Sequence, residues 1–316
     1  MRCLRPRASS VSAFHEPVLV RETLSFLRPG PGLFLDATLG DAGHSEALLL
    51  AAPELRLLAS DRDPAALAFA RERLARFGDR VTIVHGTFRD LPAHHAALGG
   101  ERLAGALFDY GLSSRQIDDP ARGMSYRQEG PLDLRMDPSR GETLADKLAE
   151  VSEEVLADVL RTHGDIGPAR PLARALVAAA QGGGLTNTRQ LAELVGRVLR
   201  DSRPAALAPV FQALRVWVND EMADLEASLA WLPEVMADEG VVVTLSYHSG
   251  EDRRVKQALR GPSRVASRRR PPSADESATG PWQELTRKVV VASEQEQQSN
   301  PRARSARLRA FRRKPR

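Results

Sequence analysis

The sequence predicts an α/β fold in which a parallel sheet is covered by helices on both faces and is interrupted by an inserted helical segment. Up to Asp109, short apolar runs alternate with stretches whose apolar residues lie three and four apart. From Thr143 to Trp231 the pattern is helical throughout, and strand character returns only at Val241. A purely helical block between strands of one sheet indicates an insertion.

Five apolar runs have the length and composition of buried strands, and three of them end on an aspartate. They are residues 33–36, 56–61, 81–85, 103–109 and 241–247. Residues 285–291 are a candidate for a last strand, and residues 45–52 and 64–77 have the pattern of intervening helices. Because ligands of such sheets bind beyond the carboxyl ends of the strands, the residues that follow each strand are the first candidates for a site.

The inserted segment is predicted to contain four helices, at residues 144–160, 168–180, 188–199 and 205–232. This pattern divides the chain into a first part of the main domain (1–118), a helical subdomain (119–209) and a second part of the main domain (210–316). Residues 262–281 are rich in Pro, Ser and Arg and are predicted to form a mobile loop.

Composition narrows the class of protein. The chain has 316 residues and one cysteine, Cys3, which excludes an intrachain disulfide and a cysteine-based metal cluster and fits a reducing cytoplasm. No apolar stretch is long enough to span a bilayer, and residues 1–10 lack the apolar segment of a signal peptide. We therefore expect a cytoplasmic protein with no membrane partner.

The formal net charge of +4 conceals an asymmetry along the chain. Residues 253–316 hold 18 Lys/Arg and 5 Asp/Glu, a net charge of +13, whereas the rest of the chain has a net charge of −9. Such a basic segment is typical of proteins that bind a polyanion, because Arg and Lys replace the counterions of phosphates. The alternative, a solvated arginine-rich tail, is equally compatible with the charge alone.

The first strand leads into a glycine-containing turn and a helix start at residues 34–44. Small residues in such a turn let a ligand approach the backbone, and Asp61, at the end of the next strand, is placed to accept both hydroxyls of a ribose. Nicotinamide enzymes and methyltransferases both use this arrangement. The Gly-x-Gly-x-x-Gly fingerprint is absent, and Asp36 at the start of the turn suits a cationic cofactor such as S-adenosylmethionine better than an anionic one.

Seven longer motifs, in order along the chain, resemble those of the ribosomal small-subunit methyltransferase H family. They are HEPVL (15–19), DRDP (61–64), DYGLSSRQ (109–116), GPLDLRMD (130–137), FQALRVWVNDE (211–221), YHSGEDR (247–253) and NPRARSARLR (300–309). The sequence differs from the family pattern at Ala42, Tyr110, Gly250 and the stretch 167–171.

This resemblance implies a Rossmann-like class I S-adenosylmethionine-dependent methyltransferase fold with an inserted all-helical subdomain for substrate recognition. It also implies methylation of the N4 amine of a cytidine in the decoding region of 16S rRNA, within the small ribosomal subunit. The implied cofactor contacts are Ala42, Gly43 and His44 at the methionine end of the donor, Asp61 at the ribose, Phe88 at the adenine, and Asp109 and Gln116 near the methyl group.

Candidate substrate residues lie in the same motifs: Arg135, Arg215, Asn219, His248 and Ser249. The two arginines have a structural alternative, which is an ion pair with a carboxylate such as Asp133 or Glu221. A homodimer is left open. No metal is expected, because the adjacent His94 and His95 cannot easily share one ion and no further ligands cluster near them.

Asp109 is the candidate catalytic residue, because it ends the fourth strand and can accept a hydrogen bond from the attacking amine; plain donor binding is an equally good interpretation. Two other classes remain open. A nicotinamide-dependent oxidoreductase is disfavoured by the missing glycine fingerprint. A ribosome assembly factor that keeps the fold but has lost turnover is left open by Tyr110 and Gly250.

Overall fold

The computed structural model describes residues 17–260 and 280–316. The loop predicted at 262–281 therefore lies almost entirely outside the described residues, as do the first two residues of the HEPVL motif. Among the described residues, none of the helices is long and apolar enough to cross a membrane.

The described strands form one sheet in the order β3-β2-β1-β4-β5-β7-β6. They are β1 (Gly32–Asp36), β2 (Leu55–Asp61), β3 (Val81–His85), β4 (Leu103–Asp109), β5 (Met236–Ser246), β6 (Trp282–Glu284) and β7 (Arg307–Arg313). Strands β1 to β5 are parallel, and β7 runs antiparallel to both of its neighbours. The first four predicted strands are confirmed, and β5 begins earlier than predicted, at Met236.

The prediction of a last strand at 285–291 is wrong. Val290 makes only an isolated bridge to Leu308, and the strand beside β5 is β7, which sequence reasoning treats as part of a basic tail. The arginines of β7 prevent its prediction from the hydropathy pattern. Arg309 is nevertheless buried and donates from Nε to Asp252 Oδ1 at 2.5 Å. A buried ion pair thus satisfies a charge that the hydropathy pattern assigns to solvent.

Helices cover both faces of the sheet. One face packs against α1 (Val20–Leu27), α2 (Gly43–Ala51) and α3 (Pro64–Leu74), and the other against α4 (Leu91–Ala97), α11 (Glu221–Val235) and α12 (Ser249–Arg260). The alternation of side chains along a strand separates the two cores, so that Phe34 joins the first and Leu33 and Leu35 join the second. The short helices α5 (Ser114–Asp118) and α13 (Glu294–Ser299) complete this domain. The predicted α/β class is confirmed.

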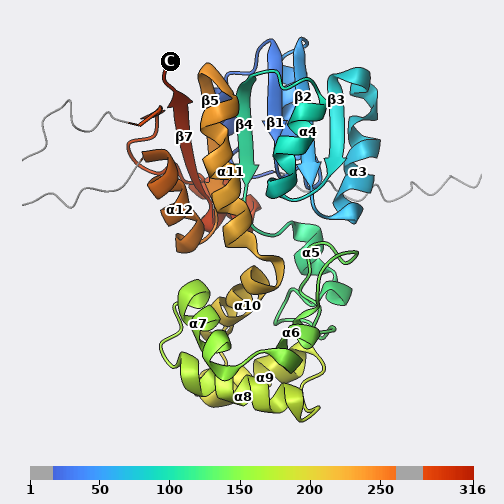
Figure 1. Cartoon of the computed structure of the whole chain (residues 1–316), viewed down its shortest axis with the longest axis vertical. Coiled ribbons are helices and arrows are strands. Elements are labelled where there is room, and N and C mark those ends of the chain that lie inside the picture. The colour runs from blue at the N-terminus through green and yellow to red at the C-terminus, as the bar shows by residue number, and fades with distance from the viewer. Residues whose placement is uncertain (1–16, 261–279) are drawn as a thin grey trace, which may run out of the picture.

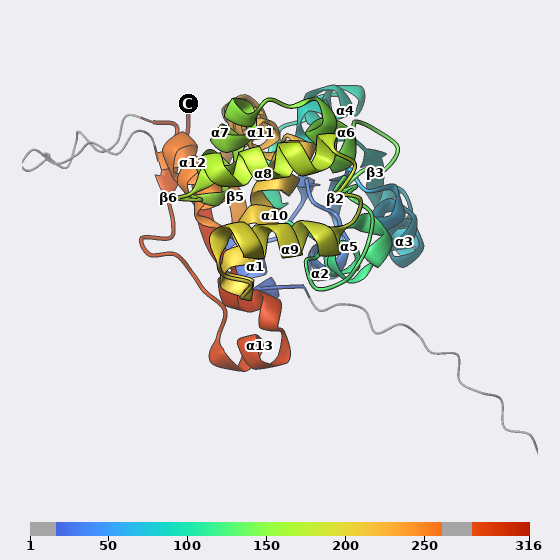
Figure 2. The same ribbon diagram turned by 90° about the horizontal axis from the view of Figure 1, so that it is seen from below.

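The helical subdomain lies beyond the carboxyl ends of the parallel strands (Figure 1). It consists of α6 (Leu144–Glu150), α7 (Glu153–Gly164), α8 (Ala169–Gln181), α9 (Thr188–Leu199) and α10 (Pro204–Asn219). Its apolar core is separate from both cores of the sheet and extends from Met124 to Leu214. Viewed from below, α8 and α9 lie across the end of the domain (Figure 2).

Two of the four predicted helices are each two helices in the structure. The helix predicted at 144–160 is α6 followed by α7, and the second of these begins where Ser152 caps it by accepting a hydrogen bond from Val155 N at 3.3 Å. The helix predicted at 205–232 is α10 followed by α11, and the two are separated at Asp220, which adopts a left-handed conformation (φ 52°). The predicted subdomain boundary at 209 falls inside α10, whose Val210 and Leu214 pack in the helical core. Helix α10 continues to Asn219, and the break at Asp220 follows it.

Candidate active site

A cavity of about 380 Å³ opens at the carboxyl ends of β1, β2, β4 and β5. The sheet domain supplies most of its wall, including Gly43, Asp61 and Asp109. The helical subdomain contributes Met136, Gln212 and Arg215 to the same wall, although the last two follow β4 by about a hundred residues along the chain. The cavity therefore lies where the two domains meet, which is a common place for a small-molecule site.

The turn after β1 is shaped by buried polar contacts. Asp36 is 1% exposed and accepts hydrogen bonds from Ser45 Oγ at 2.6 Å and Thr38 N at 3.2 Å. Burial raises the pKa of its carboxyl. Ala42 has a left-handed backbone (φ 61°) and is fully buried behind the turn, so it does not line the cavity as the resemblance implies, whereas Gly43 does.

The side chain of Pro17 leaves no room for a Cβ atom at Gly43. A Cβ at this position would lie 2.7 Å from Pro17 Cγ, within the wall of the cavity. Sequence reasoning attributes the small residues of this turn to close approach of a ligand; at Gly43 the structure shows close approach of the chain itself.

Asp61 ends β2 and organises the loop around it. Its Oδ2 accepts a hydrogen bond from Gly40 N at 2.7 Å and its Oδ1 accepts one from Asp63 N at 2.8 Å. The carboxylate lines the cavity between the two loops, as predicted for a ribose ligand. Burial raises the pKa of this carboxyl to about 6.

Asp109 ends β4 and is fixed from two sides. Its backbone N–H donates to Thr38 Oγ1 at 2.7 Å, and Tyr247 Oη donates to its Oδ1 at 2.8 Å. Its Oδ2 lies 3.9 Å from His44 Nδ1 and makes no hydrogen bond to a described residue. Burial raises the pKa of Asp109 to about 6. Asp109 lines the cavity, and one of its carboxylate oxygens is hydrogen-bonded to the protein while the other accepts no hydrogen bond from a described residue.

His44 orients the wall beside Asp109. Its Nε2 lies 2.9 Å from the carbonyl oxygen of Val18, which can only accept, so this nitrogen carries the hydrogen. The other ring nitrogen, Nδ1, lies 3.9 Å from Asp109 Oδ2. His44 lines the cavity as the resemblance implies.

Phe88 forms an aromatic wall on the side of β3. Its ring meets Phe108 at 5.6 Å and Tyr110 at 5.9 Å between centroids, both edge-on. Phe88 lines the cavity while its neighbours hold the ring in place.

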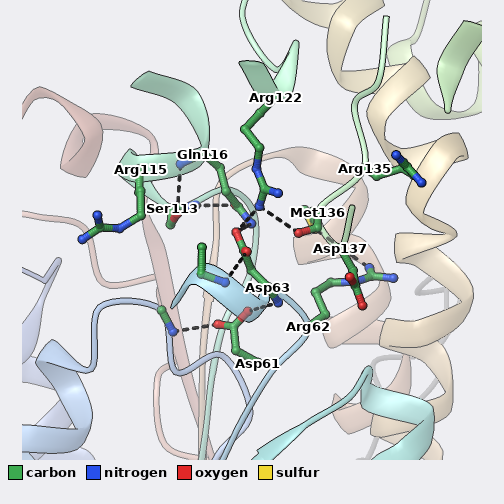
Figure 3. A network of polar contacts seen from close by, with 12 residues as sticks. Asp61, Arg62, Asp63, Ser113, Arg115, Gln116, Arg122, Arg135, Met136 and Asp137 are labelled. Carbon is green, nitrogen blue, oxygen red and sulfur yellow. Dashed lines mark hydrogen bonds and ion pairs between the residues drawn. The ribbon is translucent and has the colours of Figure 1, made fainter. Parts of the chain in front are cut away.

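Gln116 belongs to a polar network that joins the two domains (Figure 3). Its Nε2 donates to Asp63 Oδ2 at 2.9 Å, and its Oε1 accepts from Ser113 N at 3.0 Å, closing a capping box at the start of α5. Arg122 donates to the same Asp63 oxygen and, at 3.0 Å, to the carbonyl oxygen of Met136. Gln116 lines the cavity, but its amide is held by protein groups.

The candidate substrate residues separate into two groups. A second cavity, of about 180 Å³, adjoins the first. Arg135 is paired with Asp133 (Nε to Oδ1, 2.7 Å) and lines neither of the two. Asn219 is buried, and its amide is used by backbone groups, among them Met136 N at 2.7 Å. Both therefore support the shape of the subdomain.

The other three reach a cavity. Arg215 lines the main cavity while its Nε donates to Glu221 Oε1 at 2.7 Å, the ion pair that is its structural alternative. His248 lines both the main and the second cavity, and Ser249 lines the second only.

A family model described as the MraW methylase family matches residues 12–314 of the chain. The chain belongs to the MraW methylase family. The match includes both the sheet domain and the helical subdomain, and it confirms the family resemblance carried by the seven motifs.

Two relatives of this methylase are named ribosomal RNA small subunit methyltransferase H. The protein from Sorangium cellulosum is 46% identical over 313 residues, which is 98% of this chain and 92% of that protein. The protein from Anaeromyxobacter sp. strain K is 47% identical over 304 residues, covering 94% of this chain and 96% of that protein. A solved rRNA methylase from Streptococcus thermophilus is 9% identical, with a TM-score of 0.42 over 94% of this chain and 96% of that one, too weak a likeness to carry an argument.

Membership in a methylase family supports S-adenosylmethionine as the cofactor, in agreement with the acidic cavity. Sequence reasoning missed three residues that shape the methylase site: Thr38, Asp63 and Tyr247. Tyr247 lies in a recognised motif, but nothing in its spacing indicates that its hydroxyl reaches Asp109, 138 residues away. Among the described residues, no group of three His, Cys, Asp or Glu side chains could hold a metal ion.

Donor affinity of the methylase is expected to fall as the pH drops through about 6, where Asp61 and Asp109 take up protons. Ionised carboxylates accept hydrogen bonds and attract a cation, so binding is strongest above both pKa values and weakens below them. The loss approaches about tenfold per pH unit for each carboxyl involved. Calorimetric titration with S-adenosylmethionine in buffers of different ionisation enthalpy should show proton release near pH 5.5 and none near pH 8. An affinity that stays constant over this range would contradict the assignment.

Proposed function

We propose that this methylase transfers a methyl group from S-adenosylmethionine to the N4 amine of a cytidine in the decoding region of 16S rRNA. The names of the relatives support ribosomal RNA as the substrate class. The observation that carries the finer assignment is the Asp109 carboxylate, which presents one uncommitted oxygen to a cavity shared by both domains.

The residues of the sheet domain fit the donor. A cavity of about 380 Å³ has the size of a small-molecule site. In it, Asp61 would accept the ribose hydroxyls, Phe88 would stack on the adenine, and Gly43 and His44 would line the methionine end. When bound, the donor supplies an activated methyl group on a positively charged sulfur.

Asp109 would act on the nucleophile. The N4 amine of cytosine is a poor nucleophile because its lone pair is delocalised into the ring. A hydrogen bond from the amine to Asp109 Oδ2 would make the nitrogen more tetrahedral and point its lone pair at the methyl carbon. The N–C bond forms as the C–S bond breaks, and the nitrogen then loses a proton through Asp109 or directly to water. Tyr247, by holding Oδ1, would fix the direction of the other oxygen.

The helical subdomain would present the RNA. The target base must leave its stack to reach Asp109, since a paired amine is not accessible. Gln212 and Arg215 of α10 line the cavity, and His248 lines both this cavity and the second one. We assign Arg215, His248 and Ser249 to substrate contact and leave Arg135 and Asn219 as structural residues.

Mass mapping of rRNA nucleosides from cells with and without the gene tests the proposal. The expected result is the loss of one N4-methylated cytidine from 16S rRNA and its return when purified protein and donor are added to immature small subunits. Loss of a methyl group from another position would overturn the assignment of the amine. Binding of subunits without any incorporation of label would instead indicate an assembly factor that has lost turnover.

The homodimer that the sequence leaves open stays an open question. Sedimentation velocity at two protein concentrations, with and without the donor, would test it.

A further inference from the structure

A second cavity, of about 180 Å³, adjoins the first at the joint between the two domains. The end of α7 forms one wall with Thr162, His163, Gly164 and Asp165, α10 forms another, and the start of α12 forms the third. Gln212, Met222 and His248 line both cavities, so the two are separated by the thickness of single side chains. The donor and the reacting amine of the proposed methyl transfer lie in the first cavity, and of the residues assigned to substrate contact only Ser249 lines the second cavity alone.

The lining of the second cavity is rich in hydrogen-bond donors. Arg253 is exposed and makes no ion pair or hydrogen bond with a described residue. Arg254 donates from Nε to Glu226 Oε1 at 2.7 Å and from Nη1 to the Gly250 carbonyl at 3.3 Å, which leaves Nη2 without such a bond. Asp165 is the one acidic side chain among the described residues that line this cavity, and it is exposed.

The backbone adds to this donor surface. The first hydrogen bond of α12 runs from Asp252 N to His248 O at 3.3 Å, so the N–H groups of the preceding residues have no partner within the helix. Ser249 and Gly250, which carry two of these groups, line the cavity. A phosphate oxygen is a good acceptor for such N–H groups when a guanidinium lies beside them.

His248 connects the two cavities. Its ring nitrogens are buried and make no hydrogen bond to a described residue, although Nε2 lies 3.1 Å from Glu251 Oε1. Glu251 is itself fixed, because its Oε2 accepts from Tyr247 N at 2.7 Å. The same segment therefore holds Tyr247 against Asp109 and His248 against the second cavity. A ligand that spans both cavities would pass over His248.

We infer that the second cavity binds a backbone phosphodiester of the substrate RNA next to the extruded nucleotide. The inference rests on the proposed function, because a base that enters the first cavity brings its own sugar and flanking phosphates with it. Those phosphates must lie within one nucleotide of the base, and the second cavity, which shares three lining residues with the first, offers the Arg253 guanidinium and backbone amides. Arg253 is the residue that would neutralise the phosphate.

The test measures RNA affinity directly and not turnover. A fluorescent single-stranded fragment of the rRNA region is titrated with full-length protein in the presence of S-adenosylhomocysteine, at several salt concentrations. Arg253→Gln is expected to weaken binding by about fivefold to twentyfold and to lower the slope of log affinity against log salt by about 0.7, the value for one phosphate of a single strand. Arg253→Lys keeps the charge and should restore most of both.

Arg71→Gln is the matched control. Arg71 is also exposed and makes no ion pair with a described residue, but it lies on α3, near the β3 edge of the sheet (Figure 1). We expect this variant to bind RNA with wild-type affinity and salt slope, and both glutamine variants to bind S-adenosylhomocysteine normally.

The outcomes separate the two proposals. If Arg253→Gln binds the fragment like the wild type and with the same salt slope, the second cavity does not hold a phosphate, and the proposed methyl transfer is unaffected. If the wild-type protein binds neither the fragment nor immature subunits, the proposed function fails and this inference fails with it.

Discussion

Replacement of Asp109 by asparagine is expected to reduce methyl transfer to rRNA by about 10²- to 10⁴-fold, the usual range for loss of a positioned acid–base group. The substitution keeps the shape of the side chain but replaces the carboxylate with a neutral amide, whose single oxygen is a weaker acceptor for the amine and whose NH₂ group cannot accept a hydrogen bond. The rate constant at saturating donor and small subunits, measured by incorporation of a labelled methyl group, checks this expectation.

Two further variants identify the cause of the loss. Tyr247→Phe removes the hydroxyl that donates to Asp109 Oδ1 at 2.8 Å, and we expect a smaller loss of about tenfold. Asp79→Asn changes an exposed carboxylate outside the cavity and should leave the rate unchanged. If Asp109→Asn retains turnover but has lost donor affinity, Asp109 serves in donor binding alone.

Replacement of Asp63 by alanine is expected to lower the free energy of unfolding by about 3–5 kcal/mol, the cost of leaving a buried charge without its partner. Asp63 is 2% exposed and accepts hydrogen bonds from Gln116 and Arg122 (Figure 3). It also caps α3 by accepting from Ala65 N at 3.0 Å, a contact that adds about 1 kcal/mol. Urea unfolding followed by circular dichroism measures the change.

A double-mutant cycle separates these contributions. Arg122→Ala removes the other half of the ion pair, so the effect of Asp63→Ala should be much smaller in the Arg122→Ala background than in the wild type. Additive losses in the double variant would mean that the two side chains do not interact in solution. Asp63 lies in the loop after β2, and its N–H donates to Asp61, the proposed ribose ligand. The cycle therefore also measures how strongly this loop is held by the helical subdomain.

The sequence predicts the sheet well where its strands are apolar. Strands β1, β2 and β4 are mostly buried and β3 is half-buried throughout, and each of the four predictions falls within one residue of the structure. Strand β7 is different, because Arg309 and Arg313 are buried within it and only a distant partner such as Asp252 makes that burial possible. Periodicity reports the average environment of a segment and contains no information about such a partner.

The candidate site shows the same limit. Asp61, Phe88 and Asp109 follow strand ends, and the topology of a parallel sheet alone is enough to bring them together. Ala42, which the resemblance places at the donor, adopts a left-handed conformation but lies behind the wall of the cavity. Asn219 resembles a substrate residue in its motif and is instead used by backbone groups. Motif membership identifies residues that matter, and only the geometry separates contact with a ligand from support of the chain.

The place of the insertion has a mechanical consequence. Strands β4 and β5 are parallel neighbours, and α11 is the crossover helix that leads into β5. The helical segment is therefore inserted between β4 and its crossover helix. Two chain crossings attach it, one after Asp109 and one at Asp220. An appendage tethered at two points can swing about the line between them but cannot slide away. Such a swing would widen the entrance for a bulky polymer, and it would have to break the ion pair between Arg122 and Asp63 that joins the two domains.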